Sequence, residues 1–296
     1  MEYLSVKEIA DKWGLSERSV RNYCAQGRIE GAILKGKIWQ IPQDAQKPSR
    51  KTRTPKVKND LLSRLRYEKQ QGLSFGIYHN LQINFTYNSN HIEGSRLSFD
   101  QTRYIFETNT IGVKNQSADV DDVIEAKNHF RCIDFVIDNS HRQLTEKMIK
   151  ELHRILKAGT SDSDKAWFAV GDYKQLPNIV GGVATTSPEN VHAEVQKLLL
   201  DYNKSSSASF EDIVAFHCKF EKIHPFQDGN GRVGRLIMLK ECLKNGLVPF
   251  IIDDDIKAFY YRGLQNWPRE KGYMIDTCLH AQDKFKEQLK FFEIDF

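Results

Sequence analysis

Residues 224–235 read His-Pro-Phe-Gln-Asp-Gly-Asn-Gly-Arg-Val-Gly-Arg, and the chain on both sides is organised around this stretch. Pro225 disfavours the α conformation at His224, so a helix that arrives from the N-terminal side should end there. Apolar residues recur at helical spacing on both sides of the stretch, at Ile213, Phe216, Phe220 and Ile223 and again at Val233, Leu236, Ile237 and Leu243. We therefore expect a polar loop between two helices.

The residue types in this loop are those of a phosphate site. Gly229-Asn230-Gly231 can adopt positive-φ conformations that turn backbone N–H groups inward at a helix N-terminus, which favours an anion. Arg232 and Arg235 are three residues apart and share one helix face. Asp228 offers a hard oxygen ligand for Mg²⁺, and His224 offers a base. A turn with only a structural role has no need of these groups together, so the loop predicts a nucleotide-phosphate site.

The same stretch resembles the signature of the Fic (Fic/Doc) family, His-Pro-Phe-x-Asp/Glu-Gly-Asn-Gly-Arg-x-x-Arg, at every specified position. The resemblance extends over most of residues 61–296 and implies a mainly α fold, a Fic-type helical bundle with a β-hairpin flap. It also implies an adenylyltransferase that moves AMP from ATP to a Ser, Thr or Tyr hydroxyl of a target protein. The roles it implies lie in the catalytic loop 224–235: His224 as general base, Asp228 as the Mg²⁺ ligand, Gly229, Asn230 and Gly231 as the phosphate cradle, and Arg232 and Arg235 as the residues that neutralise the leaving group.

Three further segments gain an expected role from this resemblance. Ser89-Asn90-His91-Ile92-Glu93-Gly94, in a helix near residues 85–94, is similar to the family's inhibitory motif, in which the glutamate pairs with the second signature arginine and blocks the γ-phosphate position. Residues 171–188, rich in β-branched side chains around Gly181-Gly182, correspond to the flap that aligns a target segment by strand pairing. The implied target-binding residues are Lys174, where the family usually has arginine, with Asn178, Ile179 and Val180. Tyr260 and Tyr261 lie where such proteins line the adenine pocket, although an aromatic pair can equally belong to the core.

The remainder of residues 61–296 has helical periodicity, and no internal repeat is apparent. His217 lies on an apolar stripe and is expected to be a hydrogen-bonded core histidine. We expect helices over 75–92, 98–107, 120–139, from Thr145 past Ile155, over 191–202, 257–265 and 274–292.

The N-terminal residues 1–46 have the pattern of a small winged helix-turn-helix domain. Ser5-Val6-Lys7-Glu8 is a capping box, Gly14-Leu15 is a tight turn, and Ser16 starts a second helix. That helix should direct Arg18, Ser19, Arg21 and Asn22 outward, and a hairpin should follow over 33–41 with Lys35-Gly36-Lys37 at its tip. The pattern resembles the DNA-binding domains of the MerR and excisionase type. A plain packing unit is the alternative.

Charge supports a nucleic-acid contact in this part of the chain. Residues 1–60 hold 13 Lys or Arg and 7 Asp or Glu, whereas residues 61–296 hold 30 and 32. Residues 47–60 read as a basic linker, which either touches phosphates or serves only as a tether.

Composition bounds the remaining possibilities. The sequence has no apolar run of membrane-spanning length and no signal-peptide pattern, and its five cysteines have no metal or redox spacing. We therefore expect a cytoplasmic protein with ATP, a target protein and DNA as partners and no membrane contact, and a homodimer stays open.

The alternative functions are an AMP-removing Fic enzyme, in which Glu93 positions water, and a nucleotide-sensing DNA-binding regulator. A transferase of phosphate or phosphocholine is disfavoured by Gly231.

Overall fold

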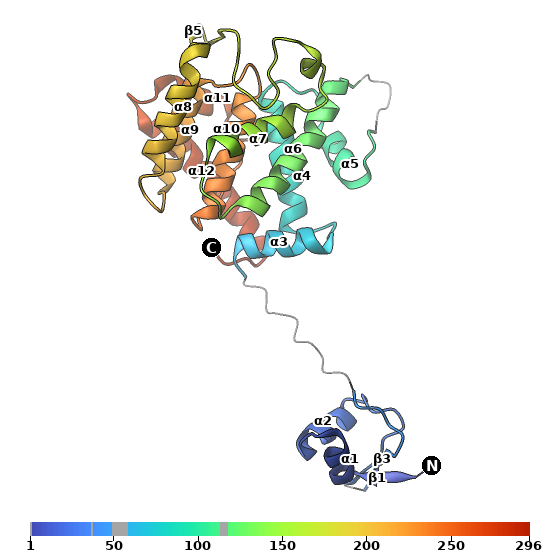
Figure 1. Ribbon diagram of the computed structural model, residues 1–296. Coiled ribbons are helices and arrows are strands. Elements are labelled where there is room, and N and C mark those ends of the chain that lie inside the picture. The colour runs from blue at the N-terminus through green and yellow to red at the C-terminus, as the bar shows by residue number, and fades with distance from the viewer. Residues whose placement is uncertain (1, 37, 49–58, 113–117) are drawn as a thin grey trace. The chain divides into compact units, whose positions relative to one another are not determined.

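The computed structural model describes residues 2–36, 38–48, 59–112 and 118–296. The chain divides into two compact units, residues 1–56 and 57–296, and each is described by itself (Figure 1). Most of the expected linker 47–60 lies outside the described residues, and so does Lys37 at the expected hairpin tip.

The small unit packs two helices against a three-stranded antiparallel sheet of order β1-β3-β2. Its elements are β1 (Tyr3–Ser5), α1 (Val6–Trp13), α2 (Glu17–Ala25), β2 (Ile33–Lys35) and β3 (Ile38–Pro42). Both predicted helix starts are confirmed, because Ser5 and Glu8 form the capping box and the Ser16 side chain accepts from the Ser19 N–H. Strand β1 is absent from the sequence prediction, since its three residues pair with distant β3 and carry no pattern of their own.

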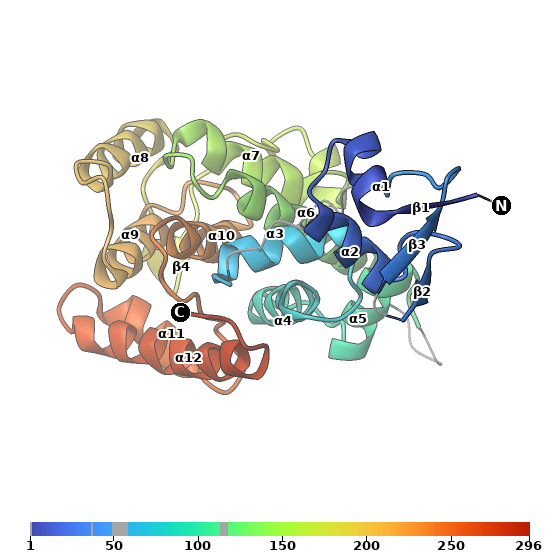
Figure 2. The ribbon, with the colours of Figure 1, turned by 90° about the horizontal axis from the view of Figure 1, so that it is seen from below.

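The large unit is a helical bundle built around one central helix (Figures 1 and 2). Its helices are α3 (Leu61–Gln71), α4 (Ile77–Ile92), α5 (Phe99–Thr108), α6 (Val120–Asn139), α7 (Glu146–Lys157), α8 (Pro188–Tyr202), α9 (Phe210–Ile223), α10 (Asn230–Lys244), α11 (Lys257–Asn266) and α12 (Lys271–Phe291). The central helix is α10, which packs against α4, α6, α7 and α9. The predicted helices are confirmed, with small shifts at their ends: α4 begins at Ile77 because Gly76 has a φ of 123°.

Side-chain caps define several of these helix starts. Ser98 with Gln101 and Ser209 with Asp212 form capping boxes, and Thr145 accepts from the Met148 N–H. Each such cap typically stabilises a helix by about 1 kcal/mol. Because these contacts are local, the sequence was sufficient to predict them.

Burial on all sides distinguishes α10 from its neighbours. Fourteen of its fifteen residues are buried, and they include Arg232, Arg235, Lys240 and Glu241. A charge inside a protein is tolerated only when it is paired and hydrogen bonded. The residues packed around α10 must therefore provide carboxylate and carbonyl partners for these four charged side chains. Several of these partners belong to the candidate active site.

A short hairpin interrupts the helices between α7 and α8. Strands β4 (Ile179–Val180) and β5 (Val183–Ala184) pair antiparallel, and Gly181 and Gly182 between them have φ values of 56° and 80°. Two successive positive φ values are the signature of a type I′ turn, which glycine adopts without strain. A short 3₁₀ helix, Ser161–Asp164, lies between α7 and this hairpin.

The two ends of the large unit meet. The Asp295 N–H donates to the Asn59 carbonyl at 3.0 Å, and Asn59 Nδ2 donates to the Glu293 carbonyl at 2.7 Å. This contact places the C-terminus beside the start of α3 (Figure 1). All five cysteines are buried free thiols, and among the described residues no helix has both the length and the apolar character needed to span a membrane.

Candidate active site

The loop between α9 and α10 forms as a sharp turn. Helix α9 ends at Ile223, and His224 caps it in the left-handed region with a φ of 53°. Gly229 has a φ of 81° and precedes the first residue of α10. The Asn230 side chain closes the turn, because its Oδ1 accepts from the Phe226 N–H and its Nδ2 donates to the Phe226 carbonyl, both at 2.8 Å.

One detail of the sequence prediction is wrong. Of the three residues expected to adopt positive φ, only Gly229 does so, because Asn230 and Gly231 already belong to the first turn of α10. Gly231 instead leaves room for the Glu93 carboxylate, which a Cβ at this position would displace. The prediction of an anion site thus depends on Gly229 and on the N-terminus of α10 and not on a run of positive φ values.

His224 is suited to act as a base. Burial, with Lys174 nearby, lowers the pKa of His224 to about 4. The imidazole is therefore neutral at pH 7 and able to accept a proton. Its Nδ1 is buried and has no hydrogen-bond partner among the described residues.

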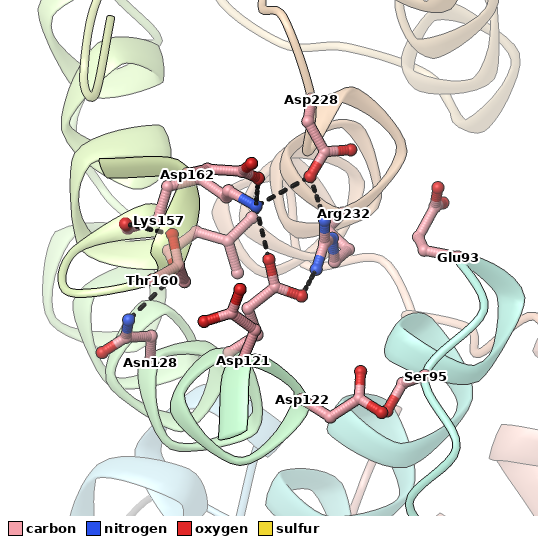
Figure 3. Close-up of polar contacts among 12 residues, drawn as sticks. Glu93, Ser95, Asp121, Asp122, Asn128, Lys157, Thr160, Asp162, Asp228 and Arg232 are labelled. Atoms are coloured by element: carbon pink, nitrogen blue, oxygen red, sulfur yellow. Dashed lines mark hydrogen bonds and ion pairs between the residues drawn. The ribbon is translucent and has the colours of Figure 1, made fainter. Parts of the chain in front are cut away.

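Asp228 lies in a cluster of charges at the opposite side of the loop (Figure 3). Its Oδ2 accepts from Lys157 Nζ at 2.8 Å and from Arg232 Nη2 at 2.9 Å. Arg232 also donates to Glu125, and Lys157 to Glu125 and Asp162. Burial alone would raise the pKa of Asp228, but Arg232 and Lys157 outweigh it and hold this pKa well below its usual range. Asp228 is therefore a carboxylate.

Glu93 and Arg235 form the pair that the inhibitory motif implies. Arg235 Nη2 donates to Glu93 Oε1 at 2.7 Å and to the Ser89 carbonyl at 2.8 Å, and its Nε donates to Ser89 Oγ at 3.0 Å. The guanidinium is 4% exposed and the glutamate 28%, so the pair lies at the edge of the core. These three hydrogen bonds all come from the end of α4, and the guanidinium also lies 6.0 Å from the centre of the Tyr260 ring.

A second carboxyl group near Arg235 belongs to Glu221. Burial and Glu93 raise the pKa of Glu221 to about 8, against the opposing effect of Arg235. Glu221 is therefore largely protonated at pH 7 and leaves Glu93 as the counter-ion of Arg235. His217 is buried with its Nε2 at 2.7 Å from the Tyr260 hydroxyl, which confirms the expected core histidine.

The two tyrosines of the expected adenine pocket lie in different environments. Tyr260 is 1% exposed and packs in the core beside His217. Tyr261 is 44% exposed, and its hydroxyl donates to the Ile92 carbonyl at 3.1 Å. Tyr261 thus lies at the surface next to the segment that carries Glu93, whereas Tyr260 is buried in the core.

The base of the hairpin is hydrogen bonded to the catalytic loop. The Lys174 N–H donates to the Pro225 carbonyl at 2.9 Å, and Asn178 Nδ2 donates to the Phe226 carbonyl at 3.3 Å. Lys174 is itself buried, and its Nζ donates to Asn178 Oδ1 and Thr185 Oγ1. Burial lowers the pKa of Lys174 to about 8. Ile179 and Val180 in strand β4 are exposed.

Sequence reasoning missed His153 and Lys157, both on α7. Gly171 donates its N–H to His153 Nδ1 at 2.9 Å, which leaves the proton on Nε2 to donate to the Asp228 carbonyl at 3.2 Å. The ring also stacks on Phe226 at 4.0 Å and so joins the hairpin base to the loop. Lys157 follows His153 by four residues on the buried stripe of α7. A lysine at an apolar position of a helix is the sequence feature that could have indicated a buried, paired cation.

These observations define the class of the large unit, which is a helical domain whose central helix begins at a loop that carries a neutral histidine, a carboxylate and two arginines. Sequence comparison assigns the same region to a family. The profile of the Fic/DOC family matches residues 143–242. Residues 143–242 therefore constitute a Fic/DOC family domain.

Individual relatives agree with this assignment. The chain is 28% identical over 184 residues to protein adenylyltransferase fic-1 of Caenorhabditis elegans, covering 61% of this chain and 35% of that protein. It is 29% identical over 187 residues to protein adenylyltransferase Fic of Aedes aegypti, covering 62% and 36%. The chain thus spans about a third of the length of these curated relatives.

Solved structures show the same fold. A Fic domain containing signaling protein from Bacteroides thetaiotaomicron has a TM-score of 0.58 and 27% identity, covering 78% of this chain and 90% of that one. Fic-1 from Caenorhabditis elegans has a TM-score of 0.60 and 20% identity, covering 78% and 72%. The bundle around α10 is therefore a Fic fold.

Proposed function

We propose that the large unit is a protein adenylyltransferase that transfers AMP from ATP to a Ser, Thr or Tyr hydroxyl of a target protein. The observation that carries this proposal is the neutral His224 directly before a loop whose N–H groups and two arginines suit phosphates. The names of the relatives agree with it.

In the proposed reaction, His224 accepts the proton of the acceptor hydroxyl. The hydroxyl oxygen forms a bond to the α-phosphorus, the bond from that phosphorus to its bridging oxygen breaks, and pyrophosphate leaves. Gly229, Asn230 and Gly231 direct backbone N–H groups at the phosphates. Arg232 and Arg235 neutralise the negative charge that grows on the leaving group.

Asp228 is suited to hold Mg²⁺ together with ATP. Its Oδ2 is occupied by two cations, whereas its Oδ1 makes no ion pair in the part of the chain that the structure describes, and its side chain is 46% exposed. A free, ionised carboxylate oxygen is the donor that Mg²⁺ prefers. When bound with ATP, the ion would neutralise phosphate charge and assist the departure of pyrophosphate.

Glu93 would regulate this reaction. The Arg235 guanidinium is occupied by Glu93 and Ser89, so it is not free to hold the γ-phosphate. The γ-phosphate would then settle elsewhere and leave the α-phosphorus misaligned. Incubating wild type and Glu93→Gly with α-labelled ATP and a host lysate tests the proposal, and a protein band labelled by the variant and only weakly by wild type is expected.

The exposed strand β4 is proposed to bind the target. Ile179 and Val180 present apolar side chains and an unpaired strand edge, which suits the addition of an extended peptide. Lys174 and Asn178 would contribute indirectly to target binding, because they fix the hairpin to the catalytic loop.

The pH dependence of transfer provides one test of His224. Because its pKa is about 4, the base stays neutral and the rate of Glu93→Gly should be flat from pH 8 to about 5, then fall as His224 is protonated. The measurement is the labelling rate of one acceptor protein at saturating Mg²⁺ and ATP. A midpoint at about 6.5, the ordinary histidine value, would contradict the assigned environment.

We further propose that residues 1–46 bind DNA. Arg18, Arg21 and Asn22 are exposed along α2, as a recognition helix requires, and the surrounding sequence is basic. The full chain should bind duplex DNA with an affinity that falls steeply with salt. Arg18→Ala/Arg21→Ala should reduce the slope of log K against log salt by about 1 to 2.

Lys286→Ala/Lys290→Ala is the matched control for this test, since it also removes two surface cations but from α12. It should leave the slope unchanged. No salt-sensitive affinity in wild type would favour a protein-interaction role for the small unit.

A further inference from the structure

The ammonium group of Lys157 lies at the point on which three carboxylates converge (Figure 3). Its Nζ donates to Glu125 Oε1 at 2.6 Å, to Asp162 Oδ2 at 2.8 Å and to Asp228 Oδ2 at 2.8 Å. The side chain is 3% exposed, and the three acceptors use all three of its donors. Lys157 therefore has no donor left for a nucleotide, and its effect must pass through the carboxylates.

Arg232 completes the cluster from α10. It donates to Asp228 Oδ2 at 2.9 Å and to Glu125 Oε2. Lys165 also donates to Asp162, so three cations face three carboxylates, and of these cations Lys157 and Arg232 contact Asp228. Both cations hold Asp228 through the same oxygen, Oδ2. The orientation of this carboxylate is thereby fixed, and Oδ1 is the oxygen left for another ligand.

We propose that Lys157 is a positioning residue that occupies, as a fixed internal cation, the place among Glu125, Asp162 and Asp228 that a free divalent metal ion would otherwise take. The protein alone then offers a metal little more than Asp228 Oδ1, so the ion binds only together with the phosphates of ATP and leaves with pyrophosphate. The inference rests on the proposed function, because it assigns the metal to the substrate complex and not to the resting protein.

Charge decides the direction of the expected effect. Oxygens of three carboxylates around one point form a donor set that hard divalent cations prefer. Replacing Lys157 with methionine removes the ammonium from the point between the three carboxylates and leaves the cluster with one uncompensated negative charge. The attraction of a divalent ion to this extra charge at ion-pair distance exceeds the entropy cost of ordering three short side chains. The variant should therefore gain a metal site that wild type lacks.

The test measures Mn²⁺ binding to the full chain without nucleotide, by electron paramagnetic resonance. Lys157→Met should bind Mn²⁺ at least about tenfold more tightly than wild type. In the Glu93→Gly background, the same substitution should lower AMP transfer about tenfold or more, because Asp228 is no longer held in one orientation. Metal binding and transfer would change in opposite directions, whereas a general loss of structure would weaken both.

Two variants serve as controls. Lys165→Met also removes a lysine that contacts Asp162, at 2.6 Å, but this lysine is 43% exposed, and its loss leaves Lys157 between the three carboxylates, so Mn²⁺ binding should not change. Lys157→Met/Asp162→Asn restores the original net charge and should return Mn²⁺ affinity toward that of wild type. If Lys157→Met is unstable, Mn²⁺ should raise its melting temperature and leave that of wild type unchanged.

Equal Mn²⁺ affinity of wild type and Lys157→Met without nucleotide would overturn the proposal for Lys157. Failure of wild type to bind Mn²⁺ in the presence of ATP would instead contradict the proposed function. Because the comparison without nucleotide needs neither ATP nor catalysis, the two failures are distinguishable.

Discussion

Replacing His224 with alanine is expected to reduce AMP transfer by about 10² to 10⁴-fold, the usual contribution of a positioned general base. The experiment is best done in the Glu93→Gly background, where the starting rate is high. Binding of ATP should be nearly unchanged, because His224 acts on the acceptor hydroxyl and the phosphates are held by the loop and the arginines. Transfer rates on one acceptor and the dissociation constant of ATP are the two measurements.

His192→Ala is the matched control for His224→Ala. His192 is an exposed histidine of α8 that pairs with Glu146 and touches none of the loop residues. Its loss should leave transfer unchanged. If His224→Ala transferred AMP at a rate near that of its parent, another group would have to accept the proton, and His224 would have no part in the chemistry.

The second large effect is expected from Glu93→Gly, which should raise AMP transfer by about tenfold or more, the scale of one well-placed charge-assisted contact. The variant removes the carboxylate that accepts from Arg235 at 2.7 Å, so the guanidinium keeps its contacts with Ser89 but loses its counter-ion and can pair with the γ-phosphate. The gain should vanish in Glu93→Gly/Arg235→Ala, because the released arginine is what makes the nucleotide pose productive. Thermal melting of all three proteins checks that the buried arginine does not destabilise the variant.

Equal rates for wild type and Glu93→Gly would mean that Glu93 does not inhibit. The remaining role for its carboxylate would then be to position water for hydrolytic removal of AMP. An AMP-modified acceptor protein decides this point: wild type would release AMP and Glu93→Gly would not. A chain that binds ATP without transfer or release would be a nucleotide-sensing regulator.

What the sequence predicted well was local. The capping box of Ser5 with Glu8 joins residues three apart, and the end of α9 at His224 follows from the steric demand of Pro225. The side chains of the loop 224–235 were expected to lie together for the same reason, because they occupy one short stretch of chain. Only the conformation of Asn230 and Gly231 was wrong, since the helix begins earlier than the glycines suggested.

The features that the sequence could not predict depend on contacts between elements that are distant along the chain. Nothing in the spacing joins Glu93 to Arg235, and only the resemblance to a known motif indicated that pair. The complete burial of α10 was hidden by its arginines and lysine, which resemble a solvated face until their partners are known. Lys157 is the clearest example, because its three acceptors come from α6, from the short 3₁₀ helix and from the catalytic loop.

The central claim is that the Fic domain transfers AMP and that Glu93 restrains it. The most direct test is to supply Glu93→Gly with ATP labelled at either the α- or the γ-phosphate and to follow label on one acceptor protein. We expect stable label from the α-phosphate only, at a rate well above that of wild type and abolished by His224→Ala. Label from the γ-phosphate, or none from either position, would contradict it.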